Sequence, residues 1–135
     1  MRYTAVMRLL GIDYGTKKIG LALSDEAGRF ATPYDVISSD DLCLSAVADI
    51  CIREKVGQIV IGRSLNYDGL PNPVQAETEK FVSKLAEVTG LPYEFELEVL
   101  TTKEAERDIG KDALTDARAA ALILKSYIDR KTNDR

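Results

Sequence analysis

An aspartate ends the first apolar segment of the chain, at a position suited to chemistry. The residues before Asp13 predict a buried strand over 8–13, and those over 18–24 predict a second strand. The link between them, 14–17, contains a glycine and has the length of a hairpin turn. Asp13 therefore ends a central strand, at the sheet edge where ligands bind in open α/β folds. It either caps its own turn or serves as a metal ligand.

A second aspartate interrupts an apolar stripe on the last predicted helix, 113–130. The stripe consists of Asp116, Ala120, Ile123, Leu124 and Tyr127. We expect this stripe to pack inward, where a carboxylate is costly unless it is paired or bound to a metal ion. The alternative for Asp116 is a residue of the first helical turn, stabilised there by the helix dipole.

The composition restricts the chemistry that these acids can support. Histidine is absent from all 135 residues, which excludes Ser-His-Asp triads, Cys-His dyads and zinc–histidine sites. Catalysis must use carboxylates, lysine, tyrosine, hydroxyl groups or hard metal ions bound through oxygen. The net charge of −4 argues against a general polyanion-binding surface. It leaves room for a local cationic patch or for a metal ion that bridges an acid to a phosphate.

Candidate nucleic-acid ligands gather at the same predicted edge. Lys17 and Lys18 belong to the first hairpin, and Arg63 and Asn66 follow the β-branched run 58–62. Cations and backbone amides around a carboxylate suit a phosphate that is bound through a metal ion.

The remaining pattern predicts one α/β domain over residues 1–135, with five strands and about four helices. The expected strands are 8–13, 18–24, 31–37, 58–62 and 93–99, and the expected helices are 42–54, 74–89, a short one from Thr101, and 113–130. Three strands before the first helix, followed by alternation, predict a mixed sheet flanked by helices. We expect residues 131–135 to form a frayed tail.

Two side-chain patterns carry further expectations. In the helix 74–89 the residues expected to face inward are Ala76, Phe81, Leu85 and Val88. In strand 93–99 the glutamates alternate with apolar residues, and three glutamates on one face are typical of a solvated face: Glu94, Glu96 and Glu98. By periodicity alone, Glu98 is therefore a structural residue.

The sequence also predicts a cytoplasmic protein without a membrane segment. No apolar run approaches the roughly 20 residues of a membrane helix, and the first residues lack the apolar core of a signal peptide. Cys43 and Cys51 lie in one helical pattern, without a C-x-x-C pair. We expect both to be reduced and buried.

Several segments together resemble a known family. They are Arg8–Asp25, Gly62–Gly69 with Gln75-Ala76, Glu98–Thr102 with Ala105, and Asp116–Ala120 with Leu124. They resemble the YqgF/RuvX family of RNase H-like nucleases, described as Holliday junction resolvase-like proteins and as pre-16S rRNA nucleases. The resemblance starts near Met7, so residues 1–6 are either an extension or the result of a misassigned start.

The resemblance implies a fold and an active site. The fold is an RNase H-like mixed five-stranded sheet flanked by helices, with the second strand antiparallel to the others. The implied catalytic residues, which also bind Mg²⁺ or Mn²⁺, are Asp13, Glu98 and Asp116. The chain departs from the family at Leu97 and Val99, where the family has Asp and Arg. Loss of this arginine removes a charge-assisted phosphate contact unless Arg63 or Lys17 replaces it.

These observations lead to three hypotheses of different classes. The first is a metal-dependent nuclease that hydrolyses phosphodiester bonds, either in 5′-end processing of precursor 16S rRNA on a ribosome precursor or at DNA four-way junctions. RNA is favoured because the acidic chain has no basic stripe. The second is a kinase or ATPase of the actin and sugar-kinase type, which shares the Gly-Ile-Asp-x-Gly-Thr motif but needs two domains. The third is a catalytically weakened nucleic-acid-binding protein of the same fold. The oligomeric state stays open.

Overall fold

The computed structural model describes residues 7–63, 74–97 and 115–133. The elements within these ranges are β1 (Arg8–Tyr14), β2 (Lys18–Ser24), β3 (Ala31–Ser38), α1 (Cys43–Arg53), β4 (Val56–Arg63), α2 (Gln75–Thr89), β5 (Tyr93–Leu97) and α4 (Thr115–Asn133). All five predicted strands are present, and the helices expected at 42–54, 74–89 and 113–130 match α1, α2 and α4 within a few residues.

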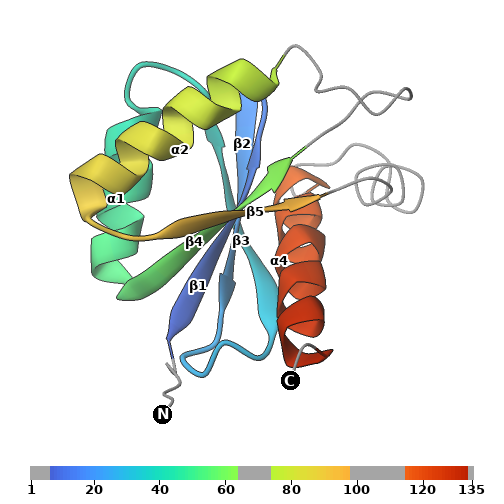
Figure 1. Ribbon diagram of the computed structural model, residues 1–135. Helices are drawn as coiled ribbons and strands as arrows, with labels where there is room; N and C mark the ends of the chain where they lie inside the picture. Colours follow the sequence, from blue (N-terminus) through green and yellow to red (C-terminus); the bar gives the residue numbers. More distant parts are fainter. Residues whose placement is uncertain (1–6, 64–73, 98–114, 134–135) are drawn as a thin grey trace.

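The strands form one mixed sheet in the order β3-β2-β1-β4-β5. The pairs β1–β2 and β2–β3 are antiparallel, whereas β1–β4 and β4–β5 are parallel. β2 is therefore antiparallel to β1, as expected. In Figure 1, α1 and α2 lie on one face of the sheet and α4 lies on the other. The carboxyl ends of β1, β4 and β5 consequently meet at one edge.

Alternation along the strands divides the interior into two cores. Leu10 and Ile12 of β1 belong to the core under α1 and α2, whereas Leu9 belongs to the core under α4. β4 contributes to both cores, with Ile59 toward α1 and α2 and Val60 toward α4. The β-branched run of β4 is thus buried on both faces of the sheet, as its sequence predicts.

The inward face of α2 differs from the prediction. Phe81 is buried and Leu85 is fully buried, but Ala76 is exposed and the side chain of Val88 is 63% exposed. The buried stripe instead runs through Gln75, Thr78, Phe81, Val82 and Leu85. Successive members of this stripe are one or three residues apart. At about 100° per residue, Ala76 lies on the opposite side of the helix and Val88 lies at the margin of the stripe. Gly90 ends the helix in the left-handed conformation, with φ 73°, as expected.

The face of β5 that was predicted to be solvated packs against α4. Glu96 is 7% exposed, and its carboxylate accepts hydrogen bonds from Ser126 Oγ at 2.9 Å and from Arg130 Nη2 at 2.8 Å. Glu94 accepts a hydrogen bond from the hydroxyl of Tyr127 at 3.0 Å. The prediction of a solvated face is therefore wrong for Glu96 and holds only in part for Glu94, whose side chain is 43% exposed, because α4 covers much of this face with matching donors. Glu98 lies outside the described residues.

The end of the chain also differs from its prediction. α4 continues to Asn133, so residues 131–133 are helical rather than frayed. Lys131 Nζ lies 3.6 Å from Glu94 Oε1 and 5.6 Å from the ring centroid of Tyr127, which ties the last turn to the sheet. Residues 134–135, residues 1–6 and the short helix expected from Thr101 fall outside the described residues.

Two simple expectations can be compared with the structure. Cys43 and Cys51 are free thiols and both are buried, as expected. Among the helices of the described residues, none is sufficiently long and apolar to cross a membrane.

Candidate active site

Asp13 projects toward the face of the sheet that α4 covers. A Cβ atom at Gly11 would lie 2.9 Å from Leu124 Cβ and 3.0 Å from the carbonyl oxygen of Ala120, so Gly11 faces α4 at very short range. Side chains two residues apart in a strand point to the same face, which assigns Asp13 to the α4 side. Asp13 is half-buried there.

Gly20 brings the start of α4 next to Asp13. Gly20 is the antiparallel partner of Asp13 across β1 and β2, and such partners have Cα atoms roughly 5 Å apart. A Cβ atom at Gly20 would overlap the carbonyl oxygen of Asp116. Only glycine allows this approach, so the first turn of α4 rests on the strand pair at the level of Asp13. The structure thereby places the backbone of Asp116 next to the strand pair that carries Asp13.

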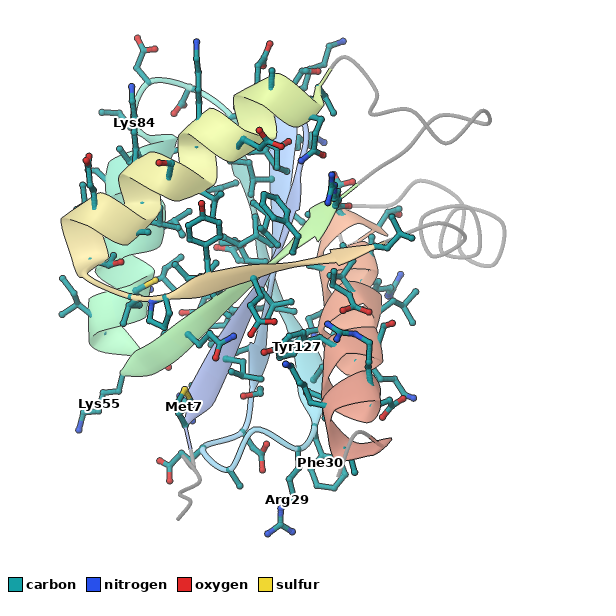
Figure 2. All side chains as sticks on the ribbon, in the orientation of Figure 1. Met7, Arg29, Phe30, Lys55, Lys84 and Tyr127 are labelled. Carbon is teal, nitrogen blue, oxygen red and sulfur yellow. The ribbon has the colours of Figure 1, made fainter. Side chains whose placement is uncertain are left out.

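The stripe predicted on the last helix is confirmed. Its apolar members are all buried: Ala120, Ile123, Leu124 and Tyr127. Asp116 is half-buried rather than fully buried, because it lies in the first turn of α4, at the edge of the sheet. In Figure 2, Tyr127 lies between α4 and the sheet, where its hydroxyl accepts a hydrogen bond from Gln58 Nε2 at 2.8 Å.

The third predicted acid and one predicted nucleic-acid ligand cannot be placed. Glu98 and Asn66 lie outside the described residues. Within ranges 7–63, 74–97 and 115–133, no group of three or more His, Cys, Asp or Glu side chains is arranged to hold a metal ion. The described part of the chain thus contributes a pair of acids, Asp13 and Asp116, and the complete triad stays a prediction.

The predicted cations surround this end of the sheet. Lys17 and Lys18 are exposed at the β1–β2 hairpin, directly after the strand that carries Asp13. Arg63 is exposed at the carboxyl end of β4, in register with Leu97 of β5. Its guanidinium carbon lies 5.9 Å from the ring centroid of Phe95. The three cations therefore lie at the carboxyl ends of β1 and β4, as the sequence predicts, but Arg63 shares the face of Phe95, which is opposite to the face of Asp13.

Sequence reasoning missed two residues that position the site. Gly20 allows α4 to pack closely against the sheet, and Glu96 connects β5 to the same helix through hydrogen bonds. The sequence did contain a signal for Gly20. Gly11 and Gly20 lie among large apolar residues of predicted strands, where a glycine often marks the close approach of another backbone. For Glu96 the alternating glutamates were misleading, because their partners, Ser126 and Arg130, lie far away in the sequence.

Comparison with known proteins identifies relatives over nearly the whole chain. The family model described as "RuvX: Holliday junction resolvase" matches residues 7–130. A protein of Rhizobium etli named "Putative pre-16S rRNA nuclease" is 38% identical over 132 residues, covering 90% of this chain and 80% of that protein. A protein of the same name from Syntrophomonas wolfei is 35% identical over 133 residues, covering 91% and 94%.

Solved structures share the fold at lower sequence identity. The RuvC protein of Thermus thermophilus superimposes with a TM-score of 0.61 at 15% identity, covering 94% of this chain and 97% of that one. The same protein in complex with a Holliday junction substrate gives a TM-score of 0.59 at 20% identity, covering 93% and 97%. These matches confirm the predicted RNase H-like fold.

Proposed function

The chain belongs to the RuvX family of Holliday junction resolvases, and from this membership we propose that it is a metal-dependent nuclease that hydrolyses phosphodiester bonds. The proposal is carried by the pairing of Asp13 with Gly20, onto which the backbone of Asp116 packs. We propose that the two carboxylates, one from a strand and one from a helix, act together in a chain without histidine. Family membership also decides against the kinase hypothesis, which rested on a single shared motif.

The donor set fits a hard divalent cation. Asp13 and Asp116 offer oxygen ligands, which Mg²⁺ and Mn²⁺ prefer, and both residues are half-buried. Glu94 and Glu96 face α4, so the alternation of β5, if it continues one residue past Leu97, predicts the same face for Glu98. These three acids would hold the metal ion. When bound, it would activate a water molecule and stabilise the leaving oxygen.

Cations around the acids give the substrate its orientation. Lys17 and Lys18 are exposed next to the carboxyl end of β1, where they would contact phosphates beside the scissile bond. Arg63 is exposed at the carboxyl end of β4, on the opposite face of the sheet, and would contact a phosphate farther along the strand. Asn66 follows Arg63 and would contribute a polar contact. Such contacts fix the position of the backbone without selecting a base sequence, so they suit an enzyme that recognises a strand end by its shape.

The proposed substrate is precursor 16S rRNA, processed at its 5′ end in the cytoplasm on a ribosome precursor. The names of the relatives from R. etli and S. wolfei support this choice. The charge supports it as well, because a net charge of −4 does not suit the broad basic face that a four-way junction requires. A single-stranded end needs only a few cations that lead it to one site. Cleavage of DNA junctions is the alternative, on account of the family itself.

A cleavage assay tests the proposal directly. Purified protein with Mn²⁺ is offered a single-stranded RNA with a precursor-like 5′ extension and, separately, a synthetic four-way DNA junction. We expect the RNA extension to be removed, and Asp13→Asn to abolish the cleavage. Asp129→Asn is the matched control, because Asp129 lies exposed on the same helix as Asp116 but in its last turns and pairs with Lys125. If the protein nicks the junction symmetrically and leaves the RNA intact, then DNA junctions rather than precursor rRNA are its substrate. Absence of both activities would favour a weakened nucleic-acid-binding protein.

A further inference from the structure

β5 is an edge strand whose residue pattern is symmetric about its middle residue. It reads Tyr93-Glu94-Phe95-Glu96-Leu97, so an aromatic residue is flanked by two acids and then by two apolar residues. Because the acids face α4, the three apolar side chains share the opposite face of the sheet. Tyr93 is 38% exposed and Leu97 is 46% exposed, whereas Phe95 is half-buried against the core under α1 and α2. β5 thus exposes an apolar row along one face.

The backbone of the same three residues points away from the sheet. Ile59 of β4 donates a hydrogen bond from its amide to the carbonyl oxygen of Pro92, at 3.0 Å. In a paired strand, the N–H and C=O groups of successive residues point to opposite sides. The even-numbered residues from Pro92 onward therefore face β4, while Tyr93, Phe95 and Leu97 direct their N–H and C=O groups outward. β5 is the last strand in the order of the described sheet, so none of its strands receives these groups.

Edge strands with outward N–H and C=O groups are usually protected, because they pair readily with other chains. The opposite edge strand, β3, has such protection: it contains Pro33, and its register with β2 shifts between Leu21 and Ala22. β5 contains neither proline nor lysine, and its register with β4 is regular. Of the two edges of the described sheet, β5 is therefore the one suited to pair with another strand.

We infer that β5 pairs antiparallel with β5 of a second copy of this chain, around a twofold axis at Phe95. This axis places Phe95 opposite its own copy, and it places Tyr93 of each copy opposite Leu97 of the other. All three residues direct their backbone groups outward, so every one of these pairs is a hydrogen-bonded pair. On the exposed face, apolar side chains meet apolar side chains. A shift by one residue would set outward groups against inward ones and leave these hydrogen bonds unmade.

The acids on the other face are compatible with this pairing. The same axis places Glu94 of each copy opposite Glu96 of the other, and like charges in that arrangement destabilise a sheet. However, Arg130 Nη2 donates to Glu96 Oε1 at 2.8 Å, and Lys131 Nζ lies 3.6 Å from Glu94 Oε1. Each acid thus has a cation from α4 of its own copy, which offsets the repulsion.

The assembly closes after two copies. Two five-stranded sheets join into one, and both edges of the joined sheet are then the protected β3. Five residues from each copy make a small interface, so we expect a reversible dimer with a micromolar or weaker Kd. Antiparallel pairing points the carboxyl ends of β1 and β4 in opposite directions in the two copies. The dimer therefore does not bring the two candidate sites together, and the inference is independent of the proposed nuclease function.

Sedimentation velocity of the unmodified protein, from micromolar to millimolar concentration, tests for the dimer. We expect the protein to shift from monomer to dimer as the concentration rises. Leu97→Lys places a charge in the apolar row and should raise the dissociation constant of the dimer roughly tenfold or more. Ile52→Lys is the matched control, because Ile52 is 74% exposed on α1, and it should dimerise like the unmodified protein.

Two results of this experiment would overturn the inference. The first is an unmodified protein that stays monomeric over the whole range, which would assign the apolar row to a different partner. The second is a dimer that Leu97→Lys weakens no more than Ile52→Lys does. Urea unfolding at micromolar concentration verifies that both variants are folded.

Cysteine cross-linking tests the register of the pair with variants that change only exposed residues. Tyr93→Cys and Leu97→Cys each add one thiol. Cα atoms of a hydrogen-bonded antiparallel pair lie roughly 5.5 Å apart, a separation that a disulfide spans. With oxidised glutathione, an equimolar mixture of the two variants should form a disulfide-linked dimer. Either variant alone should not, because its two added thiols lie roughly 13 Å apart in the dimer.

The unmodified protein is the control for cross-linking. Its own two cysteines are buried, so it should remain unlinked. Absence of linked dimer in the mixture, or equally efficient linking of one variant alone, would contradict the pairing around Phe95.

Discussion

Gly20 of β2 lies so close to Asp116 of α4 that a Cβ atom at Gly20 would overlap the carbonyl oxygen of Asp116. Because Gly20 is also the cross-strand partner of Asp13, one glycine determines how near the two acids approach. The position of α4, and with it the candidate metal site, therefore depends on a residue that bears no chemistry of its own.

Replacement of this glycine should destroy the site. Gly20→Ala must push the first turn of α4 away from the sheet, and we expect a loss of about 3 kcal/mol in the free energy of unfolding and loss of cleavage. Gly90→Ala is the control, because Gly90 has φ 73° with no atom within 4 Å of an added Cβ. Its cost should be about 1 kcal/mol, with cleavage retained. Urea unfolding and the RNA assay measure both effects. A Gly20→Ala protein with full activity would contradict this account of the site.

Metal binding should be visible without any substrate. At about one hundred times its Kd, a cation stabilises the folded state by about 2.7 kcal/mol, which corresponds to a rise in Tm of roughly 10 °C. We expect Mg²⁺ or Mn²⁺ to produce such a rise and Asp13→Asn to abolish it, whereas Asp129→Asn should respond like the unmodified protein. Differential scanning fluorimetry measures the shift. An equal rise in Asp13→Asn would mean that the cation binds elsewhere.

The ion pair between β5 and α4 should contribute strongly to stability. Glu96→Ala removes the carboxylate, at a residue that is 7% exposed, to which Ser126 and Arg130 both donate hydrogen bonds. We expect a loss of roughly 2–4 kcal/mol. The exposed pair of Lys125 and Asp129, 2.9 Å apart, is the comparison, and its removal by Asp129→Ala should cost at most about 0.5 kcal/mol. Urea unfolding measures the free energy of unfolding of both variants. If both lose a similar amount, the difference in burial does not determine how much the two ion pairs contribute to stability.

The strands could be predicted from the sequence because their signals are local. β2, over Lys18–Ser24, has the predicted bounds, and β4 shows the two-sided burial that its β-branched run indicates. The errors concern tertiary partners instead. The interpretation of Glu96 failed because nothing within β5 reveals that Arg130, 34 residues later, covers it. Val88 was misplaced because the stripe of α2 continues to the half-buried Thr89.

For the candidate site, too, local signals could be read from the sequence but tertiary contacts could not. Asp13 could be predicted from the end of an apolar strand, and Asp116 from an acid within an apolar stripe. That the two acids are neighbours was implied only by the family resemblance, since it depends on the packing of α4 against Gly20. Glu98 and Asn66 stay predictions, because they lie outside the described residues.

The buried thiol of Cys51 should make stability depend on alkaline pH. Burial raises the pKa of Cys51 from 9.0 to about 11, so the folded protein favours the neutral thiol. Its contribution to stability is therefore complete below pH 9 and is lost as the pH rises from 9 through 11. Urea unfolding at pH 8.0, 9.5 and 10.5 should show a smaller decline for Cys51→Ala than for the unmodified protein. Identical declines would mean that other groups, such as Tyr127 with its raised pKa, account for the whole effect.

The last prediction concerns the family's arginine, which Val99 replaces. Val99 lies outside the described residues, but Leu97, two residues earlier, is in register with Arg63 of β4. Arg63 is therefore the described cation that we test as its replacement. If the arginine is missing, Val99→Arg should raise kcat/KM roughly 10- to 100-fold, the value of a hydrogen bond between charged groups, without a change in the metal requirement. Val88→Arg adds the same charge to an exposed position of α2 and should have no effect. If Arg63 already replaces the lost arginine, Val99→Arg will change nothing alone but will restore cleavage to Arg63→Gln. Failure in both backgrounds would show that cleavage by this chain does not depend on a cation at either position.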